Sequence, residues 1–263
     1  KSINVPGVHI SLPALSDKDR KFIDLAIEQD LTFIAHSFVR CKEDVMCIQE
    51  ILDAKNSKIK IIAKIENQQG VDNIEEILDH VYGIMIARGD LGIEIPAEKI
   101  PAIQKKLNHI AIERMKPVIV ATQMLHTMIS NPRPTRAEVS DVANAIYDGA
   151  DAIMLSGETA SGNYPVEAVK TMTKIALEVE AIKNNISDNI SLYSKSEIAK
   201  FMAKTAVHAS VELDVKAIIA DTFGGNTIRK LAAYRGQKPI YAICYNDYVV
   251  RELALSYGVY AQS

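Results

Sequence analysis

Two short apolar runs in the chain end in charged side chains that could do chemistry together. The first run closes on Lys64 and Glu66, and the second closes on Arg88 and Asp90. Side chains on a strand alternate between its faces, so Lys64 and Glu66 point the same way. Arg88 and Asp90 repeat that spacing, unless Gly89 ends the strand between them. A cation and two carboxylates at buried strand ends are costly unless they are paired or bind something. The pattern therefore predicts a site for Mg²⁺ or Mn²⁺ with a phosphate, and a plain Lys64–Glu66 ion pair is the alternative.

Three further apolar runs also end in polar side chains, namely at Ser37, at Thr122, and at Ser156 with Glu158. In (β/α) barrels the site lies at the carboxyl ends of the strands and draws groups from several of them. An open doubly wound sheet gathers its site at one switch point instead. The repeated polar run ends therefore favour a TIM-type (β/α)8 barrel, which would be partial because a full one needs eight strands.

The elements that would hold these residues alternate between strand and helix. Near-continuous apolar runs predict strands at 31–39, 59–65, 83–87, 117–122 and 152–155. Helices are expected after Ser16 and over 43–52, 72–78, 96–115, 135–147 and 165–182, with a capping box from Thr135 to Glu138. Strands that are apolar on both faces are typical of a parallel sheet covered by helices.

A second, smaller unit is expected after a polar, aperiodic stretch at 183–195. A helix should begin at Ser196, and strands are predicted at 216–220, 239–244 and 259–261, with helices at 227–234 and 247–257. We therefore predict a partial barrel catalytic domain over 1–182, a linker over 183–195 and a partial α/β domain over 196–263. Residues 1–13 should be extended, with a turn at Pro6-Gly7.

Composition excludes several classes of protein. The chain has 263 residues and a net charge of -3, with no basic stripe, so nucleic acid is not an expected partner. No apolar run is long enough for a membrane span, and the start does not resemble a signal peptide. Without an initiator methionine, the chain is expected to be a fragment. Its three cysteines, Cys41, Cys47 and Cys244, form no C-x-x-C, which favours reduced, buried thiols and a cytoplasmic location.

Five motifs occur in an order that resembles the pyruvate kinase family. They are Lys64–Gly70, Ala87–Glu94, Ala121–Leu125, Asn131–Val142 and Met154–Ala160. The resemblance runs from Asn4 to Tyr260. It implies the later part of a barrel domain, followed by an incomplete three-layer α/β domain. It also implies that an earlier barrel segment, which carries most of the K⁺ ligands, an inserted lid domain and the end of the C-terminal domain are missing.

The resemblance further implies phosphoryl transfer from phosphoenolpyruvate to ADP, giving pyruvate and ATP in glycolysis. Lys64 would stabilise the transferring phosphoryl group, and Glu66 and Asp90 would hold Mg²⁺ or Mn²⁺. Gly89, at a helix start, would bring its backbone N–H to the substrate carboxylate. Thr122 would orient a proton source for the enolate; alternatively, it only satisfies a strand-end carbonyl.

Other residues take supporting roles by the same resemblance. Ser37 would lie near K⁺, while Arg88, Ser156 and Glu158 would support the site. The alternative for Ser156 and Glu158 is a capped turn. Arg136 would reach a neighbouring subunit in a homotetramer, and the alternative is a solvated charge at a helix start.

Two further features carry weaker expectations. The family often uses a loop equivalent to Asp221–Thr227 for a sugar-phosphate activator, but this loop lacks the expected basic residue and hydroxyl-rich run, so a capped turn is favoured. The histidines show no metal-ligand spacing and receive no role; they are His9, His36, His80, His109, His126 and His208.

Two rival functions stay open. One is a Mg²⁺-dependent, enolate-forming lyase of the pyruvate/phosphoenolpyruvate barrel type, against which the Arg133–Arg136 segment and the second α/β unit argue. The other is a non-catalytic metal-binding fragment or scaffold. With strands, lid and K⁺ site missing, the isolated chain is expected to have little kinase activity.

Overall fold

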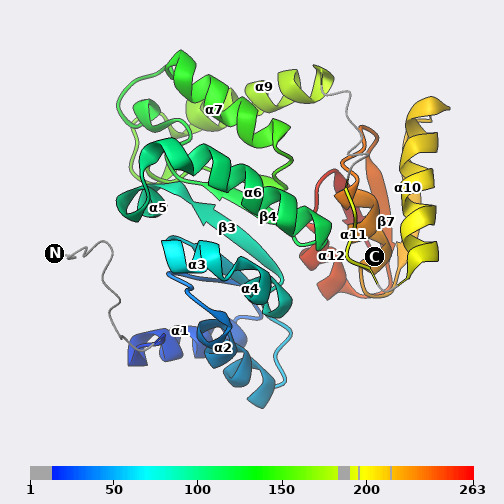
Figure 1. Cartoon of the computed structure of the whole chain (residues 1–263), viewed down its shortest axis with the longest axis horizontal. Coiled ribbons are helices and arrows are strands. Elements are labelled where there is room, and N and C mark those ends of the chain that lie inside the picture. Colours follow the sequence, from blue (N-terminus) through cyan, green and yellow to red (C-terminus); the bar gives the residue numbers. More distant parts are fainter. Residues whose placement is uncertain (1–13, 183–189, 195, 214) are drawn as a thin grey trace. The chain divides into compact units, whose positions relative to one another are not determined.

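The computed structural model describes residues 14–182, 190–194, 196–213 and 215–263, in which strands and helices alternate along the chain (Figure 1). The chain divides into two compact units, residues 1–107 and 108–263. The expected extended segment 1–13, its turn at Pro6-Gly7 and most of the expected linker, residues 183–189 and 195, lie outside the described residues. None of the described helices is both long enough and apolar enough to cross a membrane.

Within residues 14–107 the first unit holds a parallel sheet in the order β1 (Phe33–His36), β2 (Lys60–Ile65) and β3 (Gly83–Ala87). Ile34 pairs with Ile61, and Ile62 pairs with Gly83. Every residue of β3 is buried. The parallel strands expected from the apolar runs are therefore confirmed, because strands covered on both faces have no polar side.

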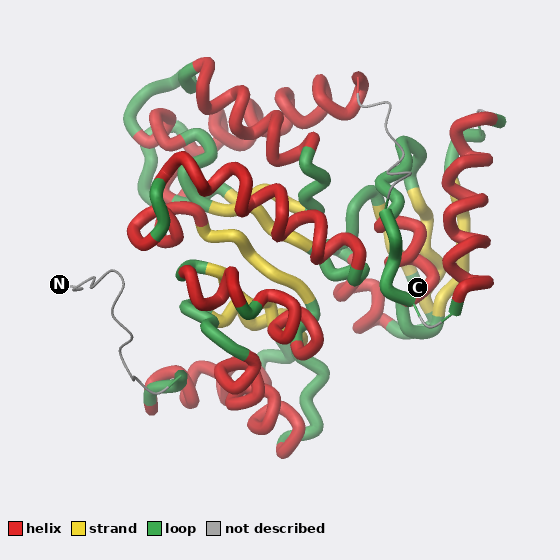
Figure 2. The backbone as a smooth tube through the Cα atoms, in the orientation of Figure 1, coloured by secondary structure: helices red, strands yellow, loops and turns green. Residues whose placement is uncertain are grey.

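Helices surround these strands (Figure 2). They are α1 (Asp17–Glu28), α2 (Lys42–Ala54), α3 (Gln68–Asp72), α4 (Ile74–His80), α5 (Arg88–Glu94), the 3₁₀ turn η1 (Ala97–Lys99) and α6 (Ile100–Glu113), which runs on into the second unit. The expected start of α1 is confirmed, because Ser16 Oγ accepts from the N–H of Asp19 and the Asp19 carboxylate accepts from the N–H of Ser16.

Several expected elements have different bounds, and the two clearest cases lie in the first unit. The strand predicted over 31–39 is only β1, because Phe38 takes a positive φ of 55° and turns the chain. The helix predicted over 72–78 is two helices, because Asn67 caps an earlier turn by accepting from the N–H of Gly70 at 2.7 Å. An asparagine cap of this kind starts a helix without any apolar periodicity to announce it.

The second unit contains two groups of strands. The first group is β4 (Val118–Ala121) paired in parallel with β5 (Ala152–Met154). Its core includes residues of α7 (Arg136–Tyr147) and α9 (Pro165–Ile182), and the short elements η2 (His126–Ile129) and α8 (Gly157–Ala160) complete it. The predicted capping box of α7 is confirmed between Thr135 and Glu138.

The other group is the parallel sheet β6 (Ile218–Thr222), β7 (Ile240–Cys244) and β8 (Val259–Gln262). It packs with α10 (Glu197–Glu212), α11 (Asn226–Ala233) and α12 (Asp247–Leu253), and Ser196 caps α10 as expected. Cys244 is buried here as predicted, but the prediction for Cys47 is wrong, because Cys47 is exposed on α2.

A buried ion pair ties the two strand groups of the second unit together. Asp151, just before β5, accepts from Arg235, just after α11, at 2.7 Å, and each side chain is 3% exposed. Asp151 also accepts from the backbone N–H groups of Val118 and Tyr257. The same carboxylate therefore joins the starts of β4 and β5 to the smaller sheet.

Candidate active site

Three of the predicted site residues meet at the carboxyl ends of β1 and β2. Lys64 lies on β2, Glu66 follows it, and Ser37 follows β1. The Lys64 ammonium donates to Ser37 Oγ at 2.9 Å and lies 2.7 Å from Glu66 Oε1. Because parallel strands end at the same edge of a sheet, adjacent strand ends bring these side chains together as the sequence predicts.

The two oxygens of the Glu66 carboxylate have different partners, a backbone N–H for one and the Lys64 ammonium for the other. Glu66 is 1% exposed, and its Oε2 accepts from the backbone N–H of Phe38 at 2.6 Å. Its buried Oε1 accepts no hydrogen bond from the described residues. The Lys64 ammonium forms an ion pair with this oxygen, but the angles of the contact are not those of a hydrogen bond. A buried carboxylate oxygen without a donor suits a cation ligand, so this residue fits Mg²⁺ or Mn²⁺.

The segment after β3 is helical, whereas the strand spacing of Arg88 and Asp90 suggests an extended backbone. The expected repeat of the strand spacing is wrong, because β3 ends at Ala87, already before Gly89, and Arg88 begins α5. Asp90 therefore lies in the first helical turn, half-buried, where the helix dipole favours a negative charge. Arg88 is buried and donates to Gln104 Oε1 at 3.4 Å. Gly89 does lie at a helix start, as expected.

The protein side chains alone do not enclose an ion. No group of three or more histidine, cysteine, aspartate or glutamate side chains in the described part of the chain is arranged to hold a metal. Glu66 and Asp90 would supply two carboxylates at most, which matches Mg²⁺, an ion that keeps water and substrate oxygens as its remaining ligands.

The second unit has its own cluster at the ends of β4 and β5. Thr122 follows β4 with φ of 69°, and Gln123 follows it with φ of 53°. Glu158, in α8, is 1% exposed; it accepts from the N–H of Leu125 at 3.1 Å and from that of Ser156 at 2.8 Å. The Ser156 side chain does not cap α8, so the capped-turn alternative is wrong for Ser156. For Glu158 it is confirmed, because the Glu158 carboxylate accepts from a backbone N–H of the turn.

The remaining candidates are Arg136 and the loop before α11, both in the second unit. Arg136 is the exposed first residue of α7. In the loop before α11, Thr222 Oγ1 accepts from the N–H of Gly225 at 2.9 Å, and Arg229 donates to Gly224 O and to Asn226 Oδ1. This is the capped turn that the sequence favours. Arg229, a basic residue bonded to the loop from one helical turn away, is a feature that sequence reasoning missed.

Comparison with known proteins identifies relatives along nearly the whole chain. A family model described as pyruvate kinase, barrel domain, matches residues 1–169, and one described as pyruvate kinase, alpha/beta domain, matches residues 200–263. A pyruvate kinase of Borreliella burgdorferi is 54% identical over 263 residues, which are 99% of this chain and 55% of the relative. One of Bacillus licheniformis is 52% identical over 100% of this chain and 46% of its own length.

A solved structure agrees. The crystal structure of a pyruvate kinase from Cryptosporidium parvum matches with a TM-score of 0.93 and 41% sequence identity, over 98% of this chain and 55% of that one. The chain thus spans about half the length of the relatives it matches. The expected fold class, barrel-type α/β followed by a second α/β unit, agrees with both family models.

Proposed function

Because the chain belongs to the pyruvate kinase family, we propose that the whole protein is a kinase that transfers the phosphoryl group of phosphoenolpyruvate to ADP, giving pyruvate and ATP. We place this reaction in glycolysis and in the cytoplasm. The observation that carries the proposal is the Ser37, Lys64 and Glu66 cluster, in which an ammonium and an oriented carboxylate share the ends of neighbouring strands.

Phosphoryl transfer depends mainly on positioning and on neutralising charge. The Lys64 ammonium is fixed by Ser37 and Glu66, so it can face a phosphoryl oxygen without reorganising. Glu66 and Asp90 would hold Mg²⁺ or Mn²⁺, and that ion would neutralise charge on the substrate oxygens. The backbone N–H of Gly89, in the first turn of α5, would approach the substrate carboxylate.

The other assignments extend the same proposal. Thr122, at the end of β4, would orient the proton source for the enolate. Ser37 Oγ accepts from Lys64 and keeps a second lone pair that could contact K⁺. Arg136, exposed at the start of α7, would reach a second subunit of a homotetramer. Ser156, Glu158 and Arg88 would support these groups.

The test is pyruvate release by the full-length protein from phosphoenolpyruvate with Mg²⁺ and K⁺. Release that requires ADP, and that falls at least about 100-fold in Lys64→Met, supports the kinase. Cleavage of a larger acid without nucleotide would instead identify the lyase, and it would overturn the proposal. Lys99→Met, a change of the same kind at an exposed lysine in η1, should keep its activity.

The 263-residue chain itself is proposed to be inactive, since it spans about half of its relatives' length. It should bind Mn²⁺ weakly without turning over substrate. Robust turnover by the purified 263-residue chain would overturn this part of the proposal.

A further inference from the structure

We propose that Glu158 is a positioning residue: its buried carboxylate ties the loop after β4 to the loop after β5 and thereby holds Thr122 in its left-handed backbone conformation. The catalytic consequence rests on the proposed function, in which Thr122 orients a proton source. The structural part stands on hydrogen bonds, burial and backbone angles.

The first step is the double role of the carboxylate. Glu158 Oε1 accepts from the N–H of Leu125, three residues after Thr122, and Oε2 accepts from the N–H of Ser156, in the loop after β5. Each oxygen thus serves one strand end. With Glu158 only 1% exposed, loss of either acceptor would leave a buried N–H without a partner, which costs about 1–3 kcal/mol.

The second step is the strain that these bonds oppose. Thr122 and Gln123 are consecutive non-glycine residues with φ of 69° and 53°. A β-branched residue rarely adopts such an angle, and each strained residue costs about 1–3 kcal/mol. Strain of this kind persists only where surrounding bonds over-determine the backbone. The Leu125 bond fixes the chain two residues after Gln123, so it resists relaxation of the strained pair.

The short helix α8, which carries Glu158, is closely packed at two glycines. A Cβ at Gly162 would lie 2.5 Å from the Glu158 carbonyl oxygen, and one at Gly157 would lie 3.0 Å from Ile129 Cδ1. The backbone of α8 therefore packs closely against Ile129 at Gly157 and against the chain at Gly162. A carboxylate on a tightly packed turn can impose its position on the two loops that it bonds.

Glu138 provides a matched control one loop further along. Its carboxylate accepts from the backbone N–H groups of Thr127, at 2.6 Å, and Thr135, at 2.8 Å, so it is bonded in the same manner. These bonds hold the start of η2 and the N-cap of α7, on the far side of Leu125 from Thr122. Replacing Glu138 should disturb its own loop and leave the strained pair in place.

The experiment compares Glu158→Gln with Glu138→Gln in the full-length protein. Backbone hydrogen exchange should rise at Leu125 and Ser156 in the first variant, and at Thr127 and Thr135 in the second. The kcat should fall about 10- to 100-fold in Glu158→Gln, with KM for phosphoenolpyruvate within about twofold, whereas Glu138→Gln keeps its kcat. The pH profile of Glu158→Gln should keep its shape, because a positioning residue carries no proton.

A rescue variant makes the proposal sharper. Glycine adopts positive φ without strain, so Gln123→Gly added to Glu158→Gln should recover part of the lost kcat. If Glu158→Gln does not fold, Glu158→Asp takes its place, because the shorter side chain cannot reach both loops. It should show the same lowered kcat with a nearly unchanged KM for phosphoenolpyruvate. Unchanged exchange at Leu125 and Ser156, or a lost limb of the pH profile, would overturn the proposal. Raised exchange in a protein that lacks kinase activity would instead refute only the proposed function.

Discussion

Glu66 Oε2 accepts a hydrogen bond from the backbone N–H of Phe38 at 2.6 Å, which joins the residue after β2 to the turn after β1. Phe38 has φ of 55° and is 59% exposed, and this turn directs its N–H toward the carboxylate. A bond of this kind fixes the orientation of a metal ligand. One oxygen of Glu66 thus holds the side chain, and Oε1, which contacts Lys64, is the oxygen that would bind the proposed metal ion.

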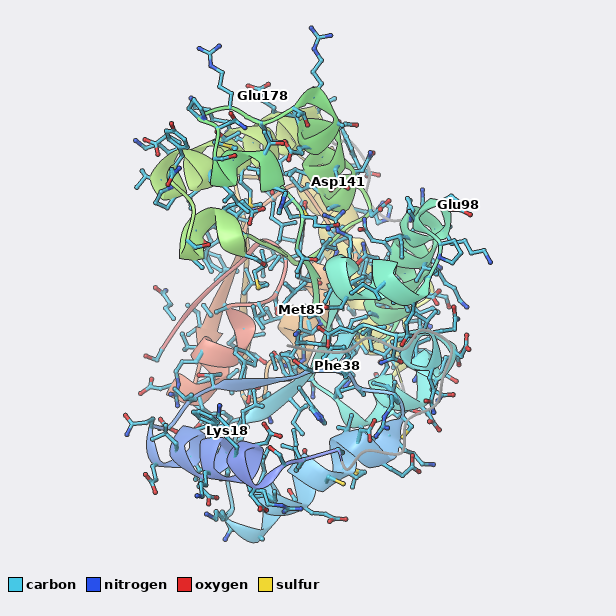
Figure 3. All side chains as sticks on the ribbon, turned by 90° about the vertical axis from the view of Figure 1, so that its left-hand side faces the viewer. Lys18, Phe38, Met85, Glu98, Asp141 and Glu178 are labelled. Atoms are coloured by element: carbon cyan, nitrogen blue, oxygen red, sulfur yellow. The ribbon has the colours of Figure 1, made fainter. Side chains whose placement is uncertain are left out.

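Replacing either proposed metal ligand should weaken Mn²⁺ binding to the full-length protein. Loss of a supporting bond to a ligand already costs about 10- to 100-fold in metal affinity, so Glu66→Gln and Asp90→Asn should each cost at least about tenfold. Calorimetric titration with Mn²⁺ measures this. Glu98→Gln, at an exposed position in η1 (Figure 3), is the matched control and should bind normally. Unchanged affinity in both ligand variants would remove them from the metal site.

Features specified by neighbouring residues could be predicted from the sequence. The N-cap at Ser16 and the capping box at Thr135 are local patterns, and the bounds of β3 follow from an apolar run with a clear end. The meeting of Lys64, Glu66 and Ser37 follows from strand alternation and a parallel sheet. Each of these depends on chemistry that can be read within a few residues.

Features that depend on tertiary contacts could not be predicted. Positive φ at Phe38, Thr122 and Gln123 leaves no signal in residue types, since none of them is glycine. The helix that begins directly at Arg88 and the burial of the Arg88 side chain have no signal in the residues around them. Of the two hydrogen bonds that Glu158 accepts, one comes from Leu125, 33 positions away, and nothing in the Ser156–Thr159 motif predicts that contact.

Stability of the chain should fall on acidification because of His36. Burial lowers the pKa of His36 below its ordinary 6.5, although a backbone bond to Ala14 and the charges of Asp44 and Asp19 oppose the shift. The unfolded chain therefore binds this proton more readily, so the contribution of His36 is present above pH 6.5 and is lost as pH falls through its lowered pKa. Urea midpoints of the chain measured from about pH 7.5 down to about pH 5 should show this decline.

His36→Gln should flatten that decline, because glutamine has a similar polar reach and no proton to bind. His80→Gln, at an exposed residue in the last turn of α4, is the control and should leave the decline in place. The same slope in His36→Gln and in the parent chain would assign the pH dependence to another group.

Two glycines of the first unit should respond oppositely to alanine. A Cβ at Gly70 would lie 2.5 Å from the backbone oxygen of Val39, so Gly70→Ala should destabilise the chain by about 1–3 kcal/mol. A Cβ at Gly92, exposed in α5, would meet nothing within 4 Å, so Gly92→Ala should stabilise by about 0.5–1 kcal/mol. Urea unfolding of both variants checks the signs, and equal shifts would contradict the packing around Gly70.

Removing one partner of the buried Asp151–Arg235 pair should strongly destabilise the second unit. Arg235 donates to Asp151, Gly149 O and Ala232 O, and its guanidinium lies 5.1 Å from the centre of the Tyr257 ring. Arg235→Met would leave a buried carboxylate without its cation, which costs about 3–5 kcal/mol. Arg235→Lys should also destabilise the chain, because one ammonium group cannot reach all three acceptors that the planar guanidinium bonds.

The loss in Arg235→Met should depend on pH in a defined direction. Burial raises the pKa of Asp151 above its ordinary 3.8, while Arg235 and the N–H groups of Val118 and Tyr257 act against that shift. Removing Arg235 raises the pKa further, so the folded variant holds the Asp151 proton more tightly and loses stability as pH rises. Urea unfolding should therefore show a smaller deficit at about pH 5 than at about pH 8. Arg251→Met, at an exposed position in α12, is the control, and its unfolding free energy should stay within about 0.5 kcal/mol of the parent chain at both pH values. A deficit in Arg235→Met that does not change with pH would show that Asp151 stays charged without its partner.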